Sequence, residues 1–432
     1  MTKDRISIFW FRRDLRLNDN HALWQALQSK FPTLPIFIFD EYFFKQFPSN
    51  DRRFNLIYDQ LFQLNLELKK YQSGIQIYKG KTTEIFHHLL RKYDIASVFC
   101  NEDYEPYAIQ RDHELQIMLQ KVGIPFSTFK DQVIFHKDEV IKENGQPYTI
   151  YTPYKNKWIS LFSLKHIKNY PSETLLHKLY QHHTPFPSKK DLGIINHLYH
   201  LKPLNLKNIA EYENIRDYPY RSGTSNASVY LRFGLISIRE LIQNTININQ
   251  HFIHELIWRE FFMQILYHFP YVEHSNFKSQ YNQLQWSNNE KHFELWTKGQ
   301  TGYPLVDAGM RELNTTGYMH NRVRMIVASF LTKHLLIDWR WGEAYFAQHL
   351  LDYELSSNNG NWQWAASTGC DAVPYFRIFN PTTQIEKYDK KLEYIKQWIP
   401  DYHPQKYIAP IINHEEARHR ALEAYKRIRL PN

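Results

Sequence analysis

The sequence has little cysteine and no long apolar run. Its two cysteines, Cys100 and Cys370, are too few for a disulfide framework, which favours a reducing compartment. No apolar stretch reaches the roughly 18 residues of a membrane-spanning helix. The first residues also lack the basic and then apolar pattern of a signal peptide. We therefore expect a cytoplasmic protein that does not enter a membrane.

Several common motifs of cofactor and metal binding are missing as well. Neither a Gly-x-Gly-x-x-Gly loop nor a Walker-type phosphate loop follows the first predicted strand, which disfavours ordinary dinucleotide or nucleoside triphosphate binding there. The 22 histidines include no His-x-x-x-His pair with a third ligand, so no metal site is expected. The sequence shows no internal repeats and no low-complexity tracts.

Length, charge and tryptophan content give the first positive indications. A chain of 432 residues exceeds one ordinary domain, so two or three hydrophobic cores are expected. The 53 basic and 44 acidic residues leave a net charge of +9, which favours a polyanionic partner. Most of the tryptophans lie beyond Arg216, which marks the second half of the chain as the unusual one.

Residues 5–130 alternate short β-branched or aromatic runs with helical patterns. This rhythm predicts a doubly wound, Rossmann-like parallel sheet, an α/β domain covering residues 1–130. The charged run Arg12–Arg16 after the first strand is interpreted as an ion-pair cluster that fixes the turn. Helices are expected near residues 20–30, 52–72, 82–93 and 106–122. Strands are expected at Arg5–Phe11, Leu34–Phe39, Ile75–Tyr78, Ala96–Phe99 and Pro125–Phe129.

Beyond residue 130 the pattern changes twice. Residues 131–204 lack periodicity, so they are interpreted as a long interdomain linker, with Tyr151–Trp158 as a docking piece. Residues 205–432 are mostly helical in pattern, which predicts an all-α second domain. The segment 249–268 is apolar almost all round and should be a buried helix. Helices are expected at 226–243, 249–268, 290–298, 305–315, 319–337, 341–351, 359–366 and 413–428.

The run from Leu351 to Pro381 is the most informative part of the chain. It places acids, amides, two tryptophans and an arginine within about one loop and one helix, and its small residues allow close approach to the backbone. Asn358 and Trp362 are four residues apart and share a helical face, whereas Trp362 and Trp364 point to nearly opposite sides. A packed core helix is the ordinary explanation of such a tryptophan pair.

This run, together with Trp10–Leu17, resembles the photolyase/cryptochrome flavoproteins, and most closely the class I cyclobutane pyrimidine dimer photolyases of bacteria. The resemblance extends over nearly the whole chain. It implies that the domain at residues 205–432 binds FAD and DNA and that the α/β domain holds an antenna chromophore. The implied activity is that of a deoxyribodipyrimidine photo-lyase, in which light-driven electron transfer from reduced FAD splits cyclobutane pyrimidine dimers in DNA.

The residues implied to hold FAD fall into two groups. Gly223–Ser228 offers hydroxyl and backbone N–H groups before a helix, which suits a pyrophosphate, although a simple capping sequence has the same composition. Where the family usually has Leu, Pro and Asp, this chain has Ala227, Val229 and Glu354. By resemblance, the FAD phosphates contact Tyr212, Thr224, Ser225 and Ser228. By resemblance, the residues near the isoalloxazine are Arg259, Asn321, Arg324, Asp352, Glu354 and Asn358.

A second set of residues is implied to receive a thymine dimer that has been flipped out of the DNA helix. Glu255 and Trp258 are three residues apart and share a helical face, and Asn321 and Met325, four apart, share another. The alternative to a substrate-binding role of Glu255 is a purely structural ion pair with Arg259. Six-four photolyases carry histidines at the positions of Asn321 and Met325, so the pocket is of the cyclobutane-dimer type. By resemblance, the dimer is contacted by Glu255, Trp258, Asn321, Met325 and Trp364.

Three tryptophans and four arginines complete the implied site. Trp362, Trp339 and Trp286 match the family's chain that carries an electron from the surface to the flavin, although three spaced tryptophans are ordinarily core residues. These three, with Glu255 and Asn358, are the implied catalytic set. Four arginines match family positions that meet the DNA backbone or brace the cofactor: Arg216, Arg259, Arg322 and Arg377. Each of them could equally be a solvated surface arginine.

The antenna and the biological role leave alternatives. Folate-binding members carry Asn-Glu where this chain has Tyr107-Ala108, which favours a deazaflavin or a second flavin over a folate and leaves a protein without an antenna as a further option. We expect a monomer that binds dimer-containing DNA. The alternative is a cryptochrome-like photoreceptor that binds FAD without repair; a long polar C-terminal extension would favour it, and the sequence ends soon after its last predicted helix. A flavin-free DNA-binding scaffold is the third option.

Overall fold

The computed structural model describes residues 3–428, which divide into two compact units. The first, the α/β unit, contains the described residues through Glu139 together with Leu161–Lys202 and Ala227–Ile246. The second, the helical unit, contains Val140–Ser160, Pro203–Asn226 and the described residues from Asn247 onward. The segment predicted as a linker, 131–204, is divided between the units: 131–139 and 161–202 belong to the α/β unit and 140–160 to the helical unit. Residues 227–246, predicted in the second domain, belong to the α/β unit.

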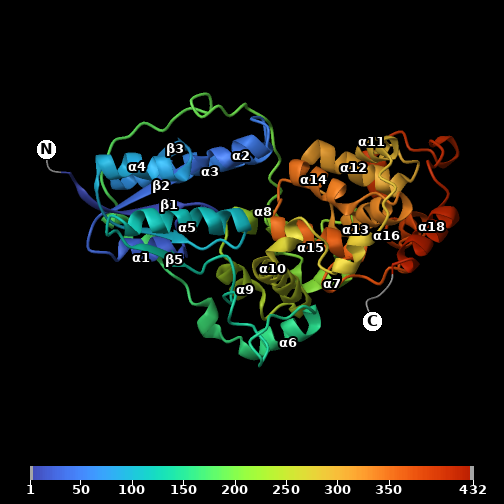
Figure 1. The fold of residues 1–432 in the computed structure, drawn as a ribbon. Helices are drawn as coiled ribbons and strands as arrows, with labels where there is room; N and C mark the ends of the chain where they lie inside the picture. Colours follow the sequence, from blue (N-terminus) through green and yellow to red (C-terminus); the bar gives the residue numbers. More distant parts are fainter. Residues whose placement is uncertain (1–2, 429–432) are drawn as a thin grey trace. The chain divides into compact units, whose positions relative to one another are not determined.

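A parallel five-stranded sheet forms the centre of the α/β unit. Its strand order is β3-β2-β1-β4-β5, which confirms the predicted doubly wound sheet (Figure 1). Strands β1 and β2 are buried along almost their whole length, as expected of parallel strands covered on both faces. The strands are β1 (Arg5–Phe11), β2 (Thr33–Asp40), β3 (Gln76–Gly80), β4 (Asp94–Asn101) and β5 (Phe126–Phe129).

The helices of this unit follow the predicted rhythm with two differences. Helix α2 was not predicted; it begins directly at the end of β2, where the Asp40 carboxylate accepts a hydrogen bond from the Tyr42 N–H. The single helix predicted at 226–243 is two helices, α8 and α9, because Gly234 between them has φ +61° and a Cβ there would lie 2.3 Å from the Arg13 carbonyl oxygen. The helices are α1 (His21–Leu27), α2 (Glu41–Gln46), α3 (Arg52–Leu68), α4 (Thr82–Lys92), α5 (Pro106–Gln120), α8 (Ala227–Arg232) and α9 (Ile238–Thr245).

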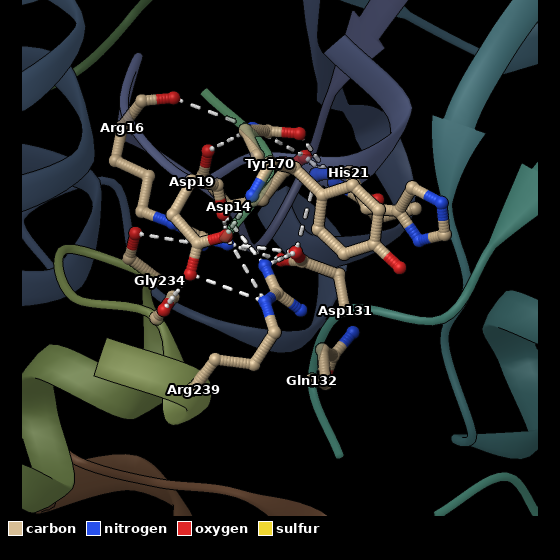
Figure 2. Close-up of polar contacts among 12 residues, drawn as sticks. Asp14, Arg16, Asp19, His21, Asp131, Gln132, Tyr170, Gly234 and Arg239 are labelled. Atoms are coloured by element: carbon tan, nitrogen blue, oxygen red, sulfur yellow. Dashed lines mark hydrogen bonds and ion pairs between the residues drawn. The ribbon is translucent and has the colours of Figure 1, made fainter. Parts of the chain in front are cut away.

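A buried ionic cluster joins α9 to the loops around β1 and β5. Arg16 and Arg239 both donate hydrogen bonds to Asp131, at 2.6 and 2.8 Å, and Arg239 also reaches Asp19 at 3.0 Å (Figure 2). Burial opposes ionisation of Asp131, but the two guanidinium groups outweigh it and hold its pKa well below the usual range. The interpretation of the run Arg12–Arg16 as an ion-pair cluster is confirmed, since Arg12 also pairs with Asp112.

The helical unit contains the long buried helix that the sequence predicted. Most side chains of α10 are buried. The predicted helix 319–337 is α13 followed by a π-helical turn at Phe330–His334. Within residues 3–428, no helix combines the length and apolarity needed to cross a membrane. The helices are α6 (Tyr151–Leu161), α7 (Tyr212–Ile215), α10 (Gln250–His268), α11 (Glu290–Thr297), α12 (Pro304–Thr316), α13 (Asn321–Ser329), α14 (Trp339–His349), α15 (Leu355–Ala366), α16 (Pro381–Tyr388), α17 (Glu393–Trp398) and α18 (His414–Lys426).

Helix α15 packs closely against both α10 and α14. A Cβ added to Gly360 of α15 would lie 2.2 Å from the Phe262 ring on α10, and one added to Gly342 of α14 would lie 2.1 Å from the Trp362 ring. Only glycine allows the helices to approach this closely. The tight packing fixes the side chains that α15 presents to the cavity described next.

Candidate cofactor and substrate site

One cavity of the helical unit brings together residues from three segments that are distant in the sequence. It encloses about 600 Å³ of empty space, part of which is open to solvent. Its walls come from α13, from the end of α14 with the following loop, and from α15. Predicted site residues that line it are Asn321, Arg324, Met325, Asp352, Glu354, Asn358, Trp362 and Trp364.

The two tryptophans of α15 stand at the edges of the face that lines the cavity. With about 100° between successive helical residues, Trp362 and Trp364 lie on nearly opposite sides of the helix, and Asn358, Asn361 and Ala365 lie between them. All five border the cavity. Trp362 is buried, whereas Trp364 is half-buried. Asn358 and Trp362 thus share the face that their spacing predicted.

Arg324 and Asp352, both implied by the resemblance to lie near the isoalloxazine, form an ion pair beside the cavity. The Arg324 Nη2 lies 2.9 Å from Asp352 Oδ2, and its Nε donates to the Met319 carbonyl oxygen at 2.7 Å. The guanidinium also lies over the ring of Tyr318, whose hydroxyl is hydrogen-bonded with Thr224. Tyr318 thus connects the predicted phosphate loop to the ion pair, a role that the sequence gave no signal to detect.

Arg259 has a different partner from Glu255, the one that sequence spacing offered. Arg259 donates from Nη2 to Glu354 Oε1 at 3.0 Å, so Arg259 faces the cavity wall and does not pair with Glu255. The Ser357 hydroxyl donates to the other oxygen of Glu354 at 3.0 Å. The longer side chain, which replaces the family's usual Asp, is therefore held at both oxygens.

Glu343 of α14 is a candidate site residue that the sequence analysis missed. The Asn358 amide donates to Glu343 Oε1 at 2.8 Å and to its backbone carbonyl at 3.0 Å. Burial raises the pKa of Glu343 to about 7; the Asn358 hydrogen bond opposes the rise, and the nearby Glu273 carboxylate adds to it. An ionisable group with a pKa near neutrality therefore contacts the asparagine at the centre of the cavity wall.

The predicted phosphate-binding residues divide between the two units. Tyr212, Thr224 and Ser225 belong to the helical unit, whereas Ser228 is an exposed residue of α8 in the α/β unit. The loop before α8 is fixed locally: the Asn205 N–H donates to the Ser225 carbonyl oxygen at 2.8 Å. A Cβ on Gly223 would lie 2.7 Å from the Ile215 carbonyl oxygen, so glycine permits the loop to pass close to α7.

Glu255 and Trp258 of α10 are not among the residues that line the cavity. Glu255 accepts a hydrogen bond from Arg216 at the end of α7. Trp258 stacks on Tyr151 of α6, with ring centroids 3.5 Å apart and ring planes 8° from parallel. Asn321 and Met325 do share a face, as predicted, because Asn321 Nδ2 lies 3.9 Å from Met325 Sδ.

The three tryptophans of the predicted electron-transfer chain belong to one hydrophobic cluster. Trp362 and Trp339 are 2% and 1% exposed, and Trp286 is half-buried and packs against the same cluster. The Trp339 Nε1 donates to Asn276 Oδ1 at 2.7 Å, which satisfies its only polar atom. Of the three, Trp286 alone is partly exposed, whereas Trp362 lines the cavity.

The arginines predicted to contact the DNA backbone differ in whether an acidic side chain already pairs with them. Arg322 lies 2.7 Å from Asp217 Oδ1 and over the ring of Tyr388 at 4.4 Å. Arg216 pairs with Glu255, and both side chains are about one-third exposed. Arg377 is exposed. Arg322 and Arg216 are thus held in place by acidic neighbours before any ligand binds.

The donor set suits an organic cofactor better than a metal ion. Among residues 3–428, no group of three or more histidines, cysteines and acidic residues is arranged to hold a metal. A cavity with aromatic walls and a few fixed polar groups is typical of a cofactor site. These features fit a planar, polar-edged ring system such as a flavin.

Comparison with known proteins decides the family. Residues 7–173 match the DNA photolyase family model, and residues 252–405 match the FAD binding domain of DNA photolyase. The deoxyribodipyrimidine photo-lyase of Escherichia coli is 36% identical over 98% of this chain and 98% of its own length. The chain belongs to the DNA photolyase family.

Solved structures of the family agree with the fold. A bacterial class III photolyase from Agrobacterium tumefaciens is 31% identical, with a TM-score of 0.87 over 99% of this chain and 98% of its own. An archaeal photolyase from Sulfolobus tokodaii, described with two FAD molecules, is 32% identical, with a TM-score of 0.80 over 98% of this chain and 99% of its own. The predicted family and the predicted α/β plus helical fold are confirmed, and residues 252–405 form the FAD-binding domain.

Proposed function

We propose that the cavity of the helical unit is where this photolyase holds the isoalloxazine of FAD and receives a flipped pyrimidine dimer. The enzyme is a deoxyribodipyrimidine photo-lyase that repairs pyrimidine dimers, as are its full-length relatives at about 35% identity. The observation that carries the site assignment is the convergence of eight predicted residues on one cavity. When bound, reduced FAD supplies, under blue light, the electron that splits the cyclobutane ring.

The cofactor end of the cavity is assigned to charged and amide groups. Arg324 and Asp352 orient the edge of the ring system, and Asn358 faces its redox-active nitrogen while Glu343 holds the Asn358 amide. Glu354, fixed by Arg259, forms the adjoining wall. Thr224 and Ser225, with Tyr212 and Ser228, are assigned to the phosphates. A bound cofactor would complete the hydrogen bonding of polar groups on these walls.

The substrate side is assigned to aromatic and amide groups. Trp364 and Trp258 flank the two bases, Asn321 and Glu255 bond to base edges, and Met325 fills the remaining apolar space. Flipping a damaged base costs less than flipping an intact one, roughly a few kcal/mol. The DNA backbone is assigned to Arg216, Arg322 and Arg377. In a plot of the logarithm of the binding constant against the logarithm of the salt concentration, each phosphate contact should make the slope more negative by about 0.9.

The electron path is assigned to Trp362, Trp339 and Trp286. The three belong to one cluster in which Trp362 lines the cavity and Trp286 is partly exposed, as a path from the surface to the cavity requires. Because these residues reduce the cofactor and do not contact the dimer, repair by protein that is already reduced should not depend on them.

For the α/β unit we propose a deazaflavin or flavin antenna in preference to a folate. Tyr107 stands where folate-binding members carry Asn, and its ring stacks on Tyr42 with centroids 3.6 Å apart. Its hydroxyl donates to Asp40 Oδ2 at 2.6 Å. Tyr107 thus presents a stacked ring and an engaged hydroxyl where folate-binding members present an amide, which supports the preference. A monomeric, cytoplasmic enzyme remains the expectation, and both cysteines are free.

An absorption spectrum and an illumination experiment test the proposal. Purified protein should show flavin absorption, and a second chromophore, if bound, should be identified by mass spectrometry after extraction. Reduced protein mixed with an oligonucleotide containing one thymine dimer should restore the absorbance of the separate thymines under blue light and not in the dark. A yellow protein without repair would instead indicate a photoreceptor, and a colourless protein would refute the cofactor site.

A further inference from the structure

Helix α6, which the sequence suggested only as a docking piece, supports the wall of the predicted substrate pocket. Its first residue, Tyr151, stacks face to face on Trp258, with centroids 3.5 Å apart. Tyr151 is only 7% exposed, whereas Trp258 is half-buried. Tyr151 therefore covers one face of the indole, and Phe261 and Phe262 of α10 also lie against the indole, with ring centroids 5.7 and 5.5 Å away. Because Trp258 is only half-buried, part of the indole remains accessible.

Both ends of Tyr151 are held by hydrogen bonds. Its backbone N–H donates to Asp371 Oδ2 at 2.9 Å, and its hydroxyl donates to the His254 carbonyl oxygen at 2.7 Å. Burial, and then the Glu255 carboxylate, raise the pKa of Tyr151, so the hydroxyl keeps its proton and remains a donor. The ring is thus tied both to α10, one turn before Trp258, and to the loop after α15.

The rest of α6 is fixed to the same helix by a buried carboxylate. Glu260 of α10 accepts hydrogen bonds from Trp158 Nε1 at 2.7 Å and from the Tyr154 hydroxyl at 3.2 Å. Trp158 and Tyr154 are 2% and 1% exposed. Because α6 cannot slide along α10 without breaking these bonds, the Tyr151 ring has one position relative to Trp258.

We propose that Tyr151 is a positioning residue that holds the Trp258 ring in the orientation needed to stack on a flipped pyrimidine. This inference rests on the proposed role of Trp258. A half-buried indole that loses its closest stacking partner is less ordered, and it would have to be ordered when the base arrives. Of the three rings that contact Trp258, Tyr151 lies nearest and is most nearly parallel, so its loss should reduce the discrimination between damaged and undamaged DNA.

The test compares Tyr151→Leu with Tyr151→Phe and with a control on the same helix. Binding to oligonucleotides with and without one thymine dimer is measured in the dark by fluorescence anisotropy, together with FAD content. Tyr151→Leu should lower the ratio of the two affinities by about three- to tenfold, the range expected for losing one aromatic pair. Tyr151→Phe retains the ring and should restore most of the ratio. Ile159→Ala changes an exposed side chain of α6, leaves the stack and the Glu260 hydrogen bonds in place, and should leave the ratio unchanged.

A double-mutant cycle with Trp258→Ala separates this inference from the proposed pocket. If Tyr151 acts through Trp258, the loss caused by Tyr151→Leu should disappear in the Trp258→Ala background. A Trp258→Ala protein with unchanged discrimination would overturn both the pocket and the inference. Lost discrimination in Trp258→Ala with none lost in Tyr151→Leu would overturn the inference alone. Tighter binding of damaged DNA by Tyr151→Leu would also overturn the inference, because the tyrosine would then occupy the place of a base.

Discussion

Replacing Glu343 by Gln should remove a pH dependence of stability that originates beside the cofactor cavity. Gln keeps an oxygen that accepts the Asn358 amide, which lies 2.8 Å from Glu343 Oε1, but it cannot ionise. Burial raises the pKa of Glu343 from an ordinary 4.5 to about 7. The perturbation therefore changes ionisation and leaves the packing nearly the same.

The direction and magnitude of this pH dependence of stability follow from the pKa of Glu343 in the unfolded and the folded protein. Between about pH 4.5 and 7 the folded protein keeps a proton on Glu343 that the unfolded chain has released. Stability therefore falls as the pH rises through this window. At about 1.36 kcal/mol for each pH unit, the full loss is about 3 kcal/mol. Gln cannot ionise, so the free energy of unfolding of Glu343→Gln should not show this loss. Near pH 7 and above, the wild type should have lost about 3 kcal/mol that the variant keeps.

Urea unfolding from about pH 5 to 8, followed by tryptophan fluorescence with FAD in excess, measures this difference. Glu294→Gln is the control, because Lys298 lowers the pKa of the exposed Glu294 and that group is already ionised throughout the range. Infrared spectra should also show a protonated carboxyl band at low pH that is absent in Glu343→Gln. Parallel stability curves for wild type and Glu343→Gln, or no such band near pH 5, would refute the reasoning.

Three further outcomes are expected. Asp352→Asn leaves the Arg324 guanidinium without its carboxylate and less firmly oriented toward the cofactor. A hydrogen bond to a charged group contributes about 1.5–3 kcal/mol, so FAD should bind about tenfold more weakly or worse by fluorescence titration. Trp286→Phe should slow photoreduction, recorded by flavin absorbance, yet spare repair by chemically reduced protein; loss of that repair would contradict the electron path. Burial lowers the pKa of Lys333, so wild-type stability should rise with pH toward about 10 relative to Lys333→Met; parallel unfolding curves would exclude a neutral lysine.

Much of the fold could be predicted because strands and helices depend on local patterns. The buried runs of β1 and β2 and the βα rhythm were sufficient for the doubly wound sheet. Helical spacing likewise placed Asn358 with Trp362, and Asn321 with Met325, on shared faces, and both pairs line the cavity. Glycine at position 234 broke a predicted helix in two, because the neighbouring backbone leaves no room for a side chain.

The partners of charged residues depended on segments that are far apart in the sequence. Glu255 and Arg259 are one helical turn apart, but Glu255 pairs with Arg216 and Arg259 with Glu354. An exposed pair on one helix contributes only about 0.3–0.5 kcal/mol, so buried partners from other segments readily replace it. Spacing along the chain therefore could not identify these pairs.

The amino-acid sequence by itself determined the family, the strand and helix pattern, and which residue types could serve a flavin and a base. Tertiary structure alone decided that Glu343 contacts Asn358 and that Tyr151 backs Trp258. The physical reason is that burial, and with it the pKa of a carboxyl or the orientation of an indole, arises only when distant segments pack together.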